Sequence, residues 1–297
     1  MLRIQPKDRG VKGTKMKGTL VVNHDLHGEK FRAQTALYLA AAERQCVDMT
    51  VRTNAEPIGR ETDFILFLSK DVRLARILEQ DGCYVFNSAS SIALCDDKSL
   101  TYLRLRGEGL PMPETLLVPM TFFAADWSEN PFVDTAAQAL GFPMVVKEAC
   151  GSFGQQVWLV HNRAELVERL NASSPKTVLL QRFVASSRGR DVRLQVVGRE
   201  VVAGMYRWSD TDFRANISNG GSMKPFSPNE SQKALALQAC DALELSFGGV
   251  DLLFGEDDEP LLCEVNSNAH IRNLLDCTGI DVAEHILAHI RETVKNV

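Results

Sequence analysis

Short apolar segments alternate with helical segments in the first third of the chain, and this alternation constrains the fold more strongly than any other feature. The predicted strands are residues 20–22, 48–51 and 64–67, and the predicted helices are residues 31–43 and 71–79. Such an alternation predicts a parallel sheet with crossover helices. We therefore expect an α/β domain over residues 18–95, preceded by a basic, flexible tail over residues 1–17.

The remainder of the chain has a different pattern, in which strands follow one another through tight turns. A helix is predicted from Asp96 to Arg106. The strands predicted in this part are residues 144–148, 157–160, 178–181, 192–197, 201–206, 249–254 and 260–265. The further helices predicted are residues 134–140, 230–243 and 282–294. Short connections between strands predict antiparallel sheets, so this part of the chain is α+β in class.

Composition limits the functions open to this chain. The formal net charge is −5, so no overall basic field indicates nucleic acid or an anionic membrane as a partner. No apolar run approaches the roughly 20 residues that span a bilayer, and the N-terminus lacks the apolar core of a secretory signal. Seven cysteines without a C-x-x-C pair indicate reduced thiols. We expect a cytoplasmic protein, for which a homo-oligomeric state stays open.

The clearest chemical signal is a predicted hairpin near the C-terminus. Asp251 lies on its first strand, and Glu264 and Asn266 lie on its second. Side chains alternate along a strand, so Glu264 and Asn266 share a face, while Cys263 and Val265 are expected to point into the core. Two carboxylates and an amide oxygen form a hard oxygen site that suits Mg²⁺. A solvated strand face is the alternative interpretation.

A lysine and a glycine-containing loop predict phosphate binding. Lys147 ends an apolar strand, where an ammonium group is costly to bury unless it meets an anion. The loop after it contains Gly151, Ser152, Phe153 and Gly154, whose backbone N–H groups can bind phosphate oxygens. An isolated pair of glycines usually marks only a turn, but its position between two strands favours a lid over phosphates.

Arginines on apolar strands indicate an acidic ligand. Arg193 and Arg207 lie on such strands, where an unpaired guanidinium is costly to desolvate. Because arginine binds carboxylates and phosphates bidentately, a buried acidic ligand explains both positions. Asp191 lies nearby and can accept hydrogen bonds from ribose hydroxyls.

A second polar group follows the first predicted strand. His24, Asp25 and His27 stand after residues 20–22, and in open α/β sheets ligands bind at such strand ends. An ordinary surface loop is the alternative interpretation.

Taken together, these motifs resemble the ATP-grasp superfamily and, most closely, its RimK-like branch. The resemblance covers most of the chain from about Leu20, and it is strongest in the segments GFPMVVK, DFRAN, GVD and EVN, which end at Lys147, Asn216, Asp251 and Asn266. It implies an α/β plus α+β fold in which a nucleotide is held between two α+β lobes behind a Rossmann-like N-terminal lobe. The implied lobes are a pre-ATP-grasp domain over residues 18–95, a central lobe over 96–184 and a C-terminal lobe over 185–297.

The resemblance also implies roles for individual residues. Lys98 and Lys147 would contact the nucleotide, together with the glycine loop and Arg207, and Asp191 would hold ribose. The hinge that reads the adenine edge would be Gln181, Arg182, Phe183 and Val184. The residues facing the γ-phosphate or a developing oxyanion would be Arg193, Arg214 and Asn216. The ligands of two Mg²⁺ ions, or of Mn²⁺ in their place, would be Asp251, Glu264 and Asn266.

The implied activity is that of an ATP-dependent carboxylate–amine ligase working through an acyl phosphate. It would join an amino acid such as glutamate, or another amine, to a peptide or small-molecule carboxylate. The sequence departs from the branch at Asn219 and in the segment that contains His270 and Arg272. We expect these three residues to contact the substrate. The alternative function is a nucleotide-binding regulatory module without turnover.

Overall fold

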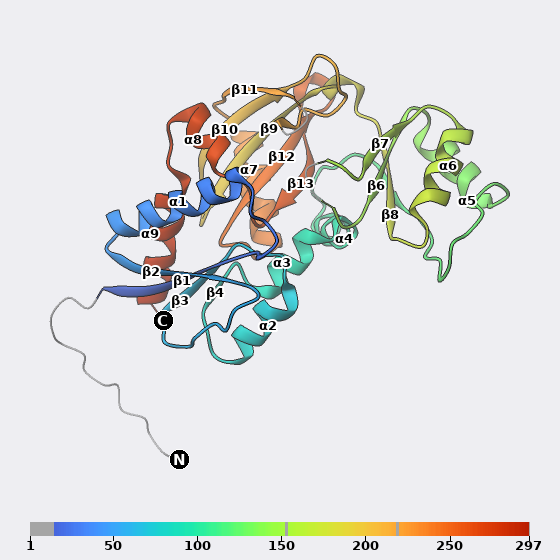
Figure 1. Ribbon diagram of the computed structural model, residues 1–297. Helices are drawn as coiled ribbons and strands as arrows, with labels where there is room; N and C mark the ends of the chain where they lie inside the picture. The colour runs from blue at the N-terminus through green and yellow to red at the C-terminus, as the bar shows by residue number, and fades with distance from the viewer. Residues whose placement is uncertain (1–14, 152–153, 218–219, 297) are drawn as a thin grey trace.

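The described part of the chain forms three sheets, each built from a successive stretch of sequence (Figure 1). The computed structural model describes residues 15–151, 154–217 and 220–296. Within these ranges, no helix combines the length and the apolar character needed to cross a membrane.

The N-terminal sheet is parallel, as the strand–helix alternation predicted, and its strand order is β2-β1-β3-β4. Its strands and the helices between and after them are β1 (Met16–Val22), α1 (Glu29–Arg44), β2 (Val47–Thr53), β3 (Phe64–Phe67), α2 (Val72–Gln80), β4 (Val85–Phe86) and α3 (Ala89–Asp96). The boundary of the predicted tail needs correction, because Met16 and Lys17 belong to β1. Residues 1–14 of that tail lie outside the described residues.

Both faces of this sheet are covered. Leu20 and Leu66 pack with Tyr38 of α1 on one face. The C-terminal helix α9 (Val282–Lys295) completes that face, and Figure 1 shows it alongside α1. Val21 and Ile65 point to the other face and pack against α2 and α3. The alternation of strand side chains therefore supplies both cores.

The central sheet is antiparallel, with strand order β5-β8-β6-β7, and two helices cover it. It follows α4 (Lys98–Gly107), whose first N–H groups are capped by the Asp97 carboxylate. The elements of this part are β5 (Thr115–Leu117), α5 (Pro131–Leu140), β6 (Met144–Glu148), β7 (Val157–Val160), α6 (Arg163–Ser173) and β8 (Val178–Arg182). Figure 1 shows it projecting from the rest of the molecule.

The C-terminal sheet is also antiparallel, in the order β11-β10-β9-β12-β13. Its elements are η1 (Ala185–Ser187), β9 (Arg190–Val197), β10 (Glu200–Trp208), β11 (Ser222–Pro225), α7 (Glu230–Ala242), β12 (Phe247–Phe254), η3 (Glu256–Asp258), β13 (Pro260–Asn266) and α8 (Arg272–Thr278). The apolar core beneath it packs against α7. The strands β9, β10, β12 and β13 overlap the strands predicted from apolar residues in this part of the sequence.

Several elements were not predicted from the sequence. The strands β4 and β5 contain two and three residues, which is too short for a hydrophobic period to be recognised. The helix α6 carried a usable signal, because Asn162 caps it and the buried Leu166 and Leu170 are one turn apart. The helices α3 and α8 and the strand β11 were also missed.

One buried asparagine joins the N-terminal part to the C-terminal sheet. The Asn87 side chain is 1% exposed. Its Nδ2 donates to the carbonyl oxygens of Phe247 and Ser267, both at 2.9 Å. Its Oδ1 accepts from the backbone N–H groups of Ser246 at 2.8 Å and Phe247 at 3.3 Å. Asn87 therefore fixes the position of β12 and the end of β13 relative to the first sheet.

We expect Asn87→Ala to lower the free energy of unfolding by roughly 3 kcal/mol, because buried backbone groups lose their partners. Urea denaturation measures this change, and Asn296→Ala, at an exposed asparagine, is the matched control. Equal stability of the two variants would contradict the bridging role.

Candidate functional site

A cavity opens between the central sheet and the C-terminal sheet; we call it the interlobe cavity. Lys147 and Gln181 line it from the central sheet, and Asp191, Asp251 and Glu264 line it from the C-terminal sheet. The structure thus brings together residues that the sequence assigned to separate motifs.

A network of alternating charges forms the C-terminal wall of this cavity. Asp251 accepts hydrogen bonds from Arg193, from Nε to Oδ1 at 2.7 Å and from Nη2 to Oδ2 at 2.6 Å. Arg207 donates to both oxygens of Asp191 at 2.6 and 2.7 Å, and its Nη2 lies 3.0 Å from Asp251 Oδ2. The sequence predicted a buried acidic ligand as the partner of Arg193 and Arg207. In the structure, both guanidinium groups instead pair with carboxylates of the protein itself.

These ion pairs favour the charged forms of Asp251 and Arg207. Burial opposes the charged form of Asp251, but Arg193 and Arg207 outweigh it and hold the pKa of this carboxyl below its usual range. Burial likewise opposes the charge on Arg207, but Asp191 and Asp251 outweigh it and raise the pKa of the guanidinium. The wall thus presents a carboxylate that stays ionised although it is buried.

A bulge in the predicted hairpin changes the expected orientation of one residue. Asp251 stands directly opposite Glu264, but the register shifts before Leu252, which pairs with Leu262. Cys263 is the extra residue, and it lines the cavity with its Sγ 3.9 Å from Lys147 Nζ. The prediction that Cys263 points into the core is therefore wrong, whereas Val265 is fully buried as predicted.

Lys147 is held in place from the central sheet. Its Nζ donates to Gln181 Oε1 at 2.7 Å, and Gln181 Nε2 donates in turn to Thr115 Oγ1 at 3.0 Å. The Lys147 side chain is nearly buried, at 9% exposure. An ammonium group oriented in this way needs little reorganisation to meet an anion in the cavity.

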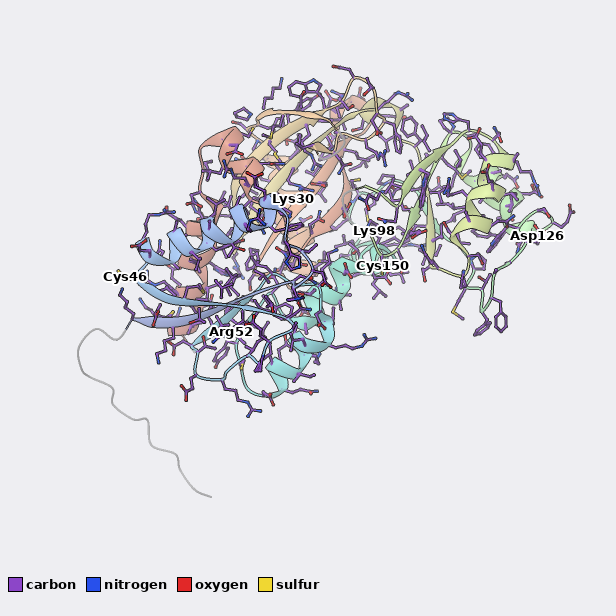
Figure 2. The ribbon with its side chains drawn as sticks, in the orientation of Figure 1. Lys30, Cys46, Arg52, Lys98, Asp126 and Cys150 are labelled. Atoms are coloured by element: carbon purple, nitrogen blue, oxygen red, sulfur yellow. The ribbon has the colours of Figure 1, made fainter. Side chains whose placement is uncertain are left out.

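A second lysine lies where α4 meets the central sheet. Lys98, labelled in Figure 2, is the first residue of α4. Its Nζ donates to the carbonyl oxygen of Gly151 at 3.2 Å and lies 3.9 Å from Glu264 Oε1. Lys98, Lys147 and Glu264 therefore surround one region of the cavity.

Arg214 connects the glycine loop to the C-terminal part. Its Nη1 donates to the carbonyl oxygen of Gly154, and its Nε and Nη2 donate to Asp212 at 3.0 and 2.8 Å. Gly154 has a φ of +70°, and a Cβ there would lie 3.0 Å from Asn216 Oδ1, so a side chain at this position would be strained and crowded. Ser152 and Phe153 of this loop, and the predicted substrate residue Asn219, lie outside the described residues.

The predicted hinge lines the cavity through Arg182, Phe183 and Val184. The guanidinium of Arg182 is bound elsewhere, to Glu114 Oε2 at 3.1 Å and to the carbonyl oxygen of Leu140 at 3.0 Å. Val145 and Leu253 also line the cavity and were not predicted. Both lie on strands whose alternation could have indicated them.

The remaining predicted residues, like Arg193, do not line the interlobe cavity. Asn266 pairs with Gly249 at the end of β13, and its Nδ2 is buried without a hydrogen-bond partner among the described residues. Arg272, at the start of α8, donates to Asp276 at 2.7 Å on its own helix. His270 lies against the Phe31 ring, with centroids 5.0 Å apart. His270 and Asn268 line a second cavity beside α1.

The fold is that of ATP-grasp ligases. A D-alanine–D-alanine ligase from Bacillus anthracis complexed with ATP has a TM-score of 0.73 at 17% identity, covering 96% of this chain and 98% of that one. A RimK domain ATP-grasp protein from Sphaerobacter thermophilus has a TM-score of 0.71 at 21% identity, covering 92% of this chain and 98% of that one.

Sequence comparison narrows the class to one family. The RimK-like ATP-grasp domain matches residues 96–290, so the chain belongs to the RimK-like ATP-grasp family. It is an ATP-dependent carboxylate–amine ligase, an enzyme that forms carbon–nitrogen bonds with ATP and a divalent metal.

Two relatives show how similar this chain is to other proteins in sequence. An uncharacterized protein of Mycoplasma genitalium is 32% identical over 213 residues, covering 70% of this chain and 73% of that one. Human beta-citrylglutamate synthase B is 36% identical over 219 residues, which cover 72% of this chain. The match spans 54% of the human protein, so this chain corresponds to about half of that relative.

We expect Lys147→Ala to weaken ATP binding at least ten-fold, because a charge-assisted hydrogen bond contributes about 1.5–3 kcal/mol. Calorimetric titration of ATP measures the affinity. Lys176→Ala is the control, since Lys176 belongs to the same part of the chain but pairs with Glu148. Unchanged affinity in Lys147→Ala would contradict the placement of the nucleotide.

His270 provides a prediction about acid stability. Burial lowers the pKa of His270 most, and the charges of Lys30 and Arg193 lower it further, from 6.5 to about 4 in all. The unfolded chain therefore binds a proton at a pH where the folded protein does not, and stability falls as the pH drops from about 6.5 to 4. The loss is on the order of 3 kcal/mol by pH 4. Urea denaturation over this range should show a shallower loss for His270→Asn than for the wild-type protein. If the free energy of unfolding of the two proteins changed in parallel with pH, the interpretation of His270 as a buried neutral imidazole would be wrong.

Proposed function

We propose that this ligase activates a small carboxylic acid as an acyl phosphate and joins it to the amino group of glutamate or a related amino acid. The observation that carries the proposal is the pairing of Asp251 with Glu264 on the wall of a cavity that Lys98 and Lys147 also line. Carboxylates for a metal and ammonium groups for phosphates thus meet in one place.

The donor set fits two Mg²⁺ ions. Asp251 and Glu264 stand opposite each other, and the Glu264 side chain is 33% exposed toward the cavity. Asn266 follows two residues later on the same strand, which completes an all-oxygen set of the kind that Mg²⁺ prefers. When bound, the ions would neutralise charge on the β- and γ-phosphates. Mn²⁺ has the same ligand preference.

The side chains of the cavity position the reactants. Lys147, oriented by Gln181, holds the phosphate chain, and the hinge residues 181–184 with Val145 and Leu253 enclose the adenine. Arg214 and Asn216 stand beside Gly154, so they approach the γ-phosphate when the glycine loop covers it. Arg193 orients Asp251 through two hydrogen bonds, and we assign it this role in place of direct oxyanion contact.

The reaction proceeds in two steps. A carboxylate oxygen of the acid attacks the γ-phosphorus, the bond to the β-phosphate oxygen breaks, and ADP leaves. The amine then attacks the acyl carbon, the bond to the phosphate oxygen breaks, and the amine proton leaves with inorganic phosphate. Binding the amine beside the acyl phosphate makes this attack effectively intramolecular. Phosphoryl transfer otherwise depends on positioning and charge neutralisation, which the cavity supplies.

The second cavity is the proposed place for an organic substrate. Within the described residues, three buried polar atoms that belong to its lining lack a hydrogen-bond partner: Gln34 Oε1, Thr53 Oγ1 and Asn268 Oδ1. The amide orientation of Asn268 is fixed, because its Nδ2 donates to the Leu68 carbonyl at 2.5 Å. Its free oxygen therefore accepts a hydrogen bond, as an amino group provides. Asn268 follows Asn266 by two residues, so this subsite borders the proposed metal ligands.

Glutamate is proposed as the amine because of the relatives. Beta-citrylglutamate synthase B and N-acetylaspartylglutamate synthase A, both from human, are named for products that contain glutamate. They match this chain at 36% and 31% identity.

The test is a matrix of carboxylic acids against amino acids, with coupled measurement of ADP and phosphate and mass spectrometry of the amide. We expect product with glutamate, and we expect Glu264→Gln to lower turnover at least about 100-fold because the metal loses a charged ligand. Circular dichroism confirms that this variant is folded. ATP binding without ADP release for every pair would instead support a nucleotide-binding module, and wild-type turnover by folded Glu264→Gln would refute the metal assignment.

A further inference from the structure

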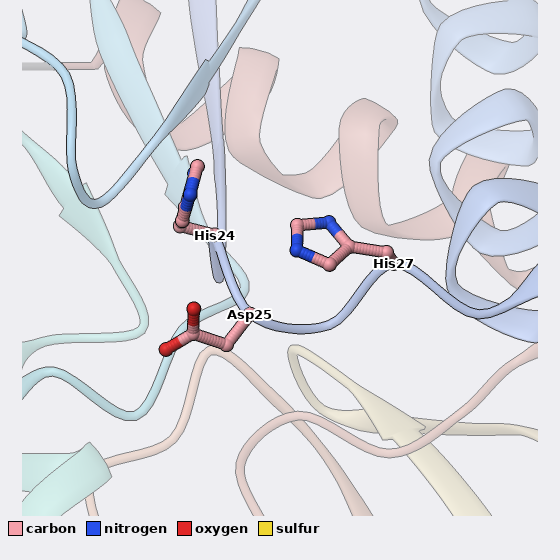
Figure 3. Close-up of side chains that lie close together, drawn as sticks. All are labelled: His24, Asp25 and His27. Atoms are coloured by element: carbon pink, nitrogen blue, oxygen red, sulfur yellow. The ribbon is translucent and has the colours of Figure 1, made fainter.

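Three side chains of metal-binding type converge on the loop between β1 and α1. His24, Asp25 and His27 each offer one ligand atom, and these atoms lie within 4.8 Å of one another. Figure 3 shows the His27 ring directed toward the other two side chains. The His24 and His27 ring centroids are 5.4 Å apart. None of the three residues takes part in the interlobe cavity.

The backbone of this loop is already held in place. The N–H of His24 donates to Asn54 Oδ1 at 2.7 Å, and the N–H of Asp25 donates to Asn23 Oδ1 at 2.8 Å. Arg32 of α1 donates to the carbonyl oxygen of His27. Binding of a metal therefore requires ordering of side chains but little ordering of the backbone, so its entropic cost is small.

The geometry suits a tetrahedral site of zinc type. Zinc bonds of 2.0–2.2 Å to nitrogen and oxygen place neighbouring ligand atoms about 3.3 Å apart. His24, Asp25 and His27 are all exposed, so little packing opposes a rotation of their side chains toward this spacing. Two imidazoles and one carboxylate favour Zn²⁺ and similar transition metals over Mg²⁺, which prefers oxygen ligands alone.

The surroundings add two further features. His24 and His27 line the second cavity, where Gln34 Oε1 and Asn268 Oδ1 are buried without partners among the described residues. Another carboxylate stands near the group: Glu56 Oε2 accepts from the Thr53 backbone N–H at 2.7 Å, next to Asn54, whose side chain binds the His24 N–H. Arg32 and Arg52 are cations in the same region, and Arg32 directs its guanidinium to a backbone carbonyl.

We propose that His24, Asp25 and His27 bind one Zn²⁺-type transition metal ion at the rim of the second cavity. Three protein ligands leave a coordination position open, as in zinc sites that bind a small molecule. That position adjoins the cavity because two of the ligands line it. A carboxylate or amino group of a bound molecule can complete the coordination while its remaining polar atoms meet Gln34 and Asn268. The site is separate from the proposed Mg²⁺ ligands and does not depend on them.

The experiment uses the full chain after removal of metals by a chelator. Zn²⁺ binding is measured by calorimetry without nucleotide and with excess Mg²⁺, which saturates oxygen sites but competes poorly for imidazole. Co²⁺ serves as a spectroscopic probe, because imidazole coordination changes its visible absorption. We expect one Zn²⁺ per chain, and we expect His24→Ala and His27→Ala each to lower the affinity by more than about 100-fold, more than loss of an outer-sphere partner does.

Two controls separate this site from others. His161→Ala removes an exposed histidine before α6, and Glu264→Gln removes a proposed Mg²⁺ ligand; both should bind Zn²⁺ as the wild-type protein does. Absence of stoichiometric Zn²⁺ binding, or equal affinity in His24→Ala, His27→Ala and His161→Ala, would overturn the proposal. Because the measurement needs no turnover, its result is independent of the proposed ligase substrates.

Discussion

The site depends on one buried carboxylate, Asp251, and on the cations that keep it ionised. Asp251 and Arg193 are cross-strand partners on β12 and β9, and Asp191 and Arg207 are partners on β9 and β10. Antiparallel register therefore places alternating charges on one face of the sheet. Loss of one member of a buried pair leaves an uncompensated charge and costs about 3–5 kcal/mol. The same pairs that keep the proposed metal ligand ionised thus constrain how the sheet can be built.

The central sheet brings cations to this carboxylate wall. Lys147 lies on β6, and its ammonium is positioned by Gln181 on the neighbouring β8. Lys98 comes from the helix that precedes that sheet. Because the cations and the carboxylates belong to different sheets, their separation depends on how the two sheets are placed. Arg214 reaches across to Gly154 and so links the glycine loop to the carboxylate side.

Much of the fold and of the motif positions could be predicted from the sequence, because both depend on local patterns. The residue ranges of β3, β6 and β7 follow from apolar runs with clear ends, and Lys147 stands out as a cation in such a run. The orientation of Cys263 could not be predicted, because a bulge changes strand alternation without changing composition. The partners of Arg193 and Arg207 depend on cross-strand register, and the contact of His270 with Phe31 joins residues far apart in the chain.

The segment after β13 connects the two cavities. Asn266 ends the strand of proposed metal ligands, the Ser267 carbonyl accepts from Asn87, and Asn268 donates to the Leu68 carbonyl. His270 then packs on α1 and lies within the electrostatic influence of Arg193, which binds Asp251. A change in the N-terminal part that moves Asn87 or Leu68 must therefore move the residues next to the proposed metal ligands. Under the proposed placement of the organic substrate in the second cavity, substrate choice would be a joint property of the N-terminal sheet and the C-terminal sheet, and substitutions at either end of this segment should act on it non-additively.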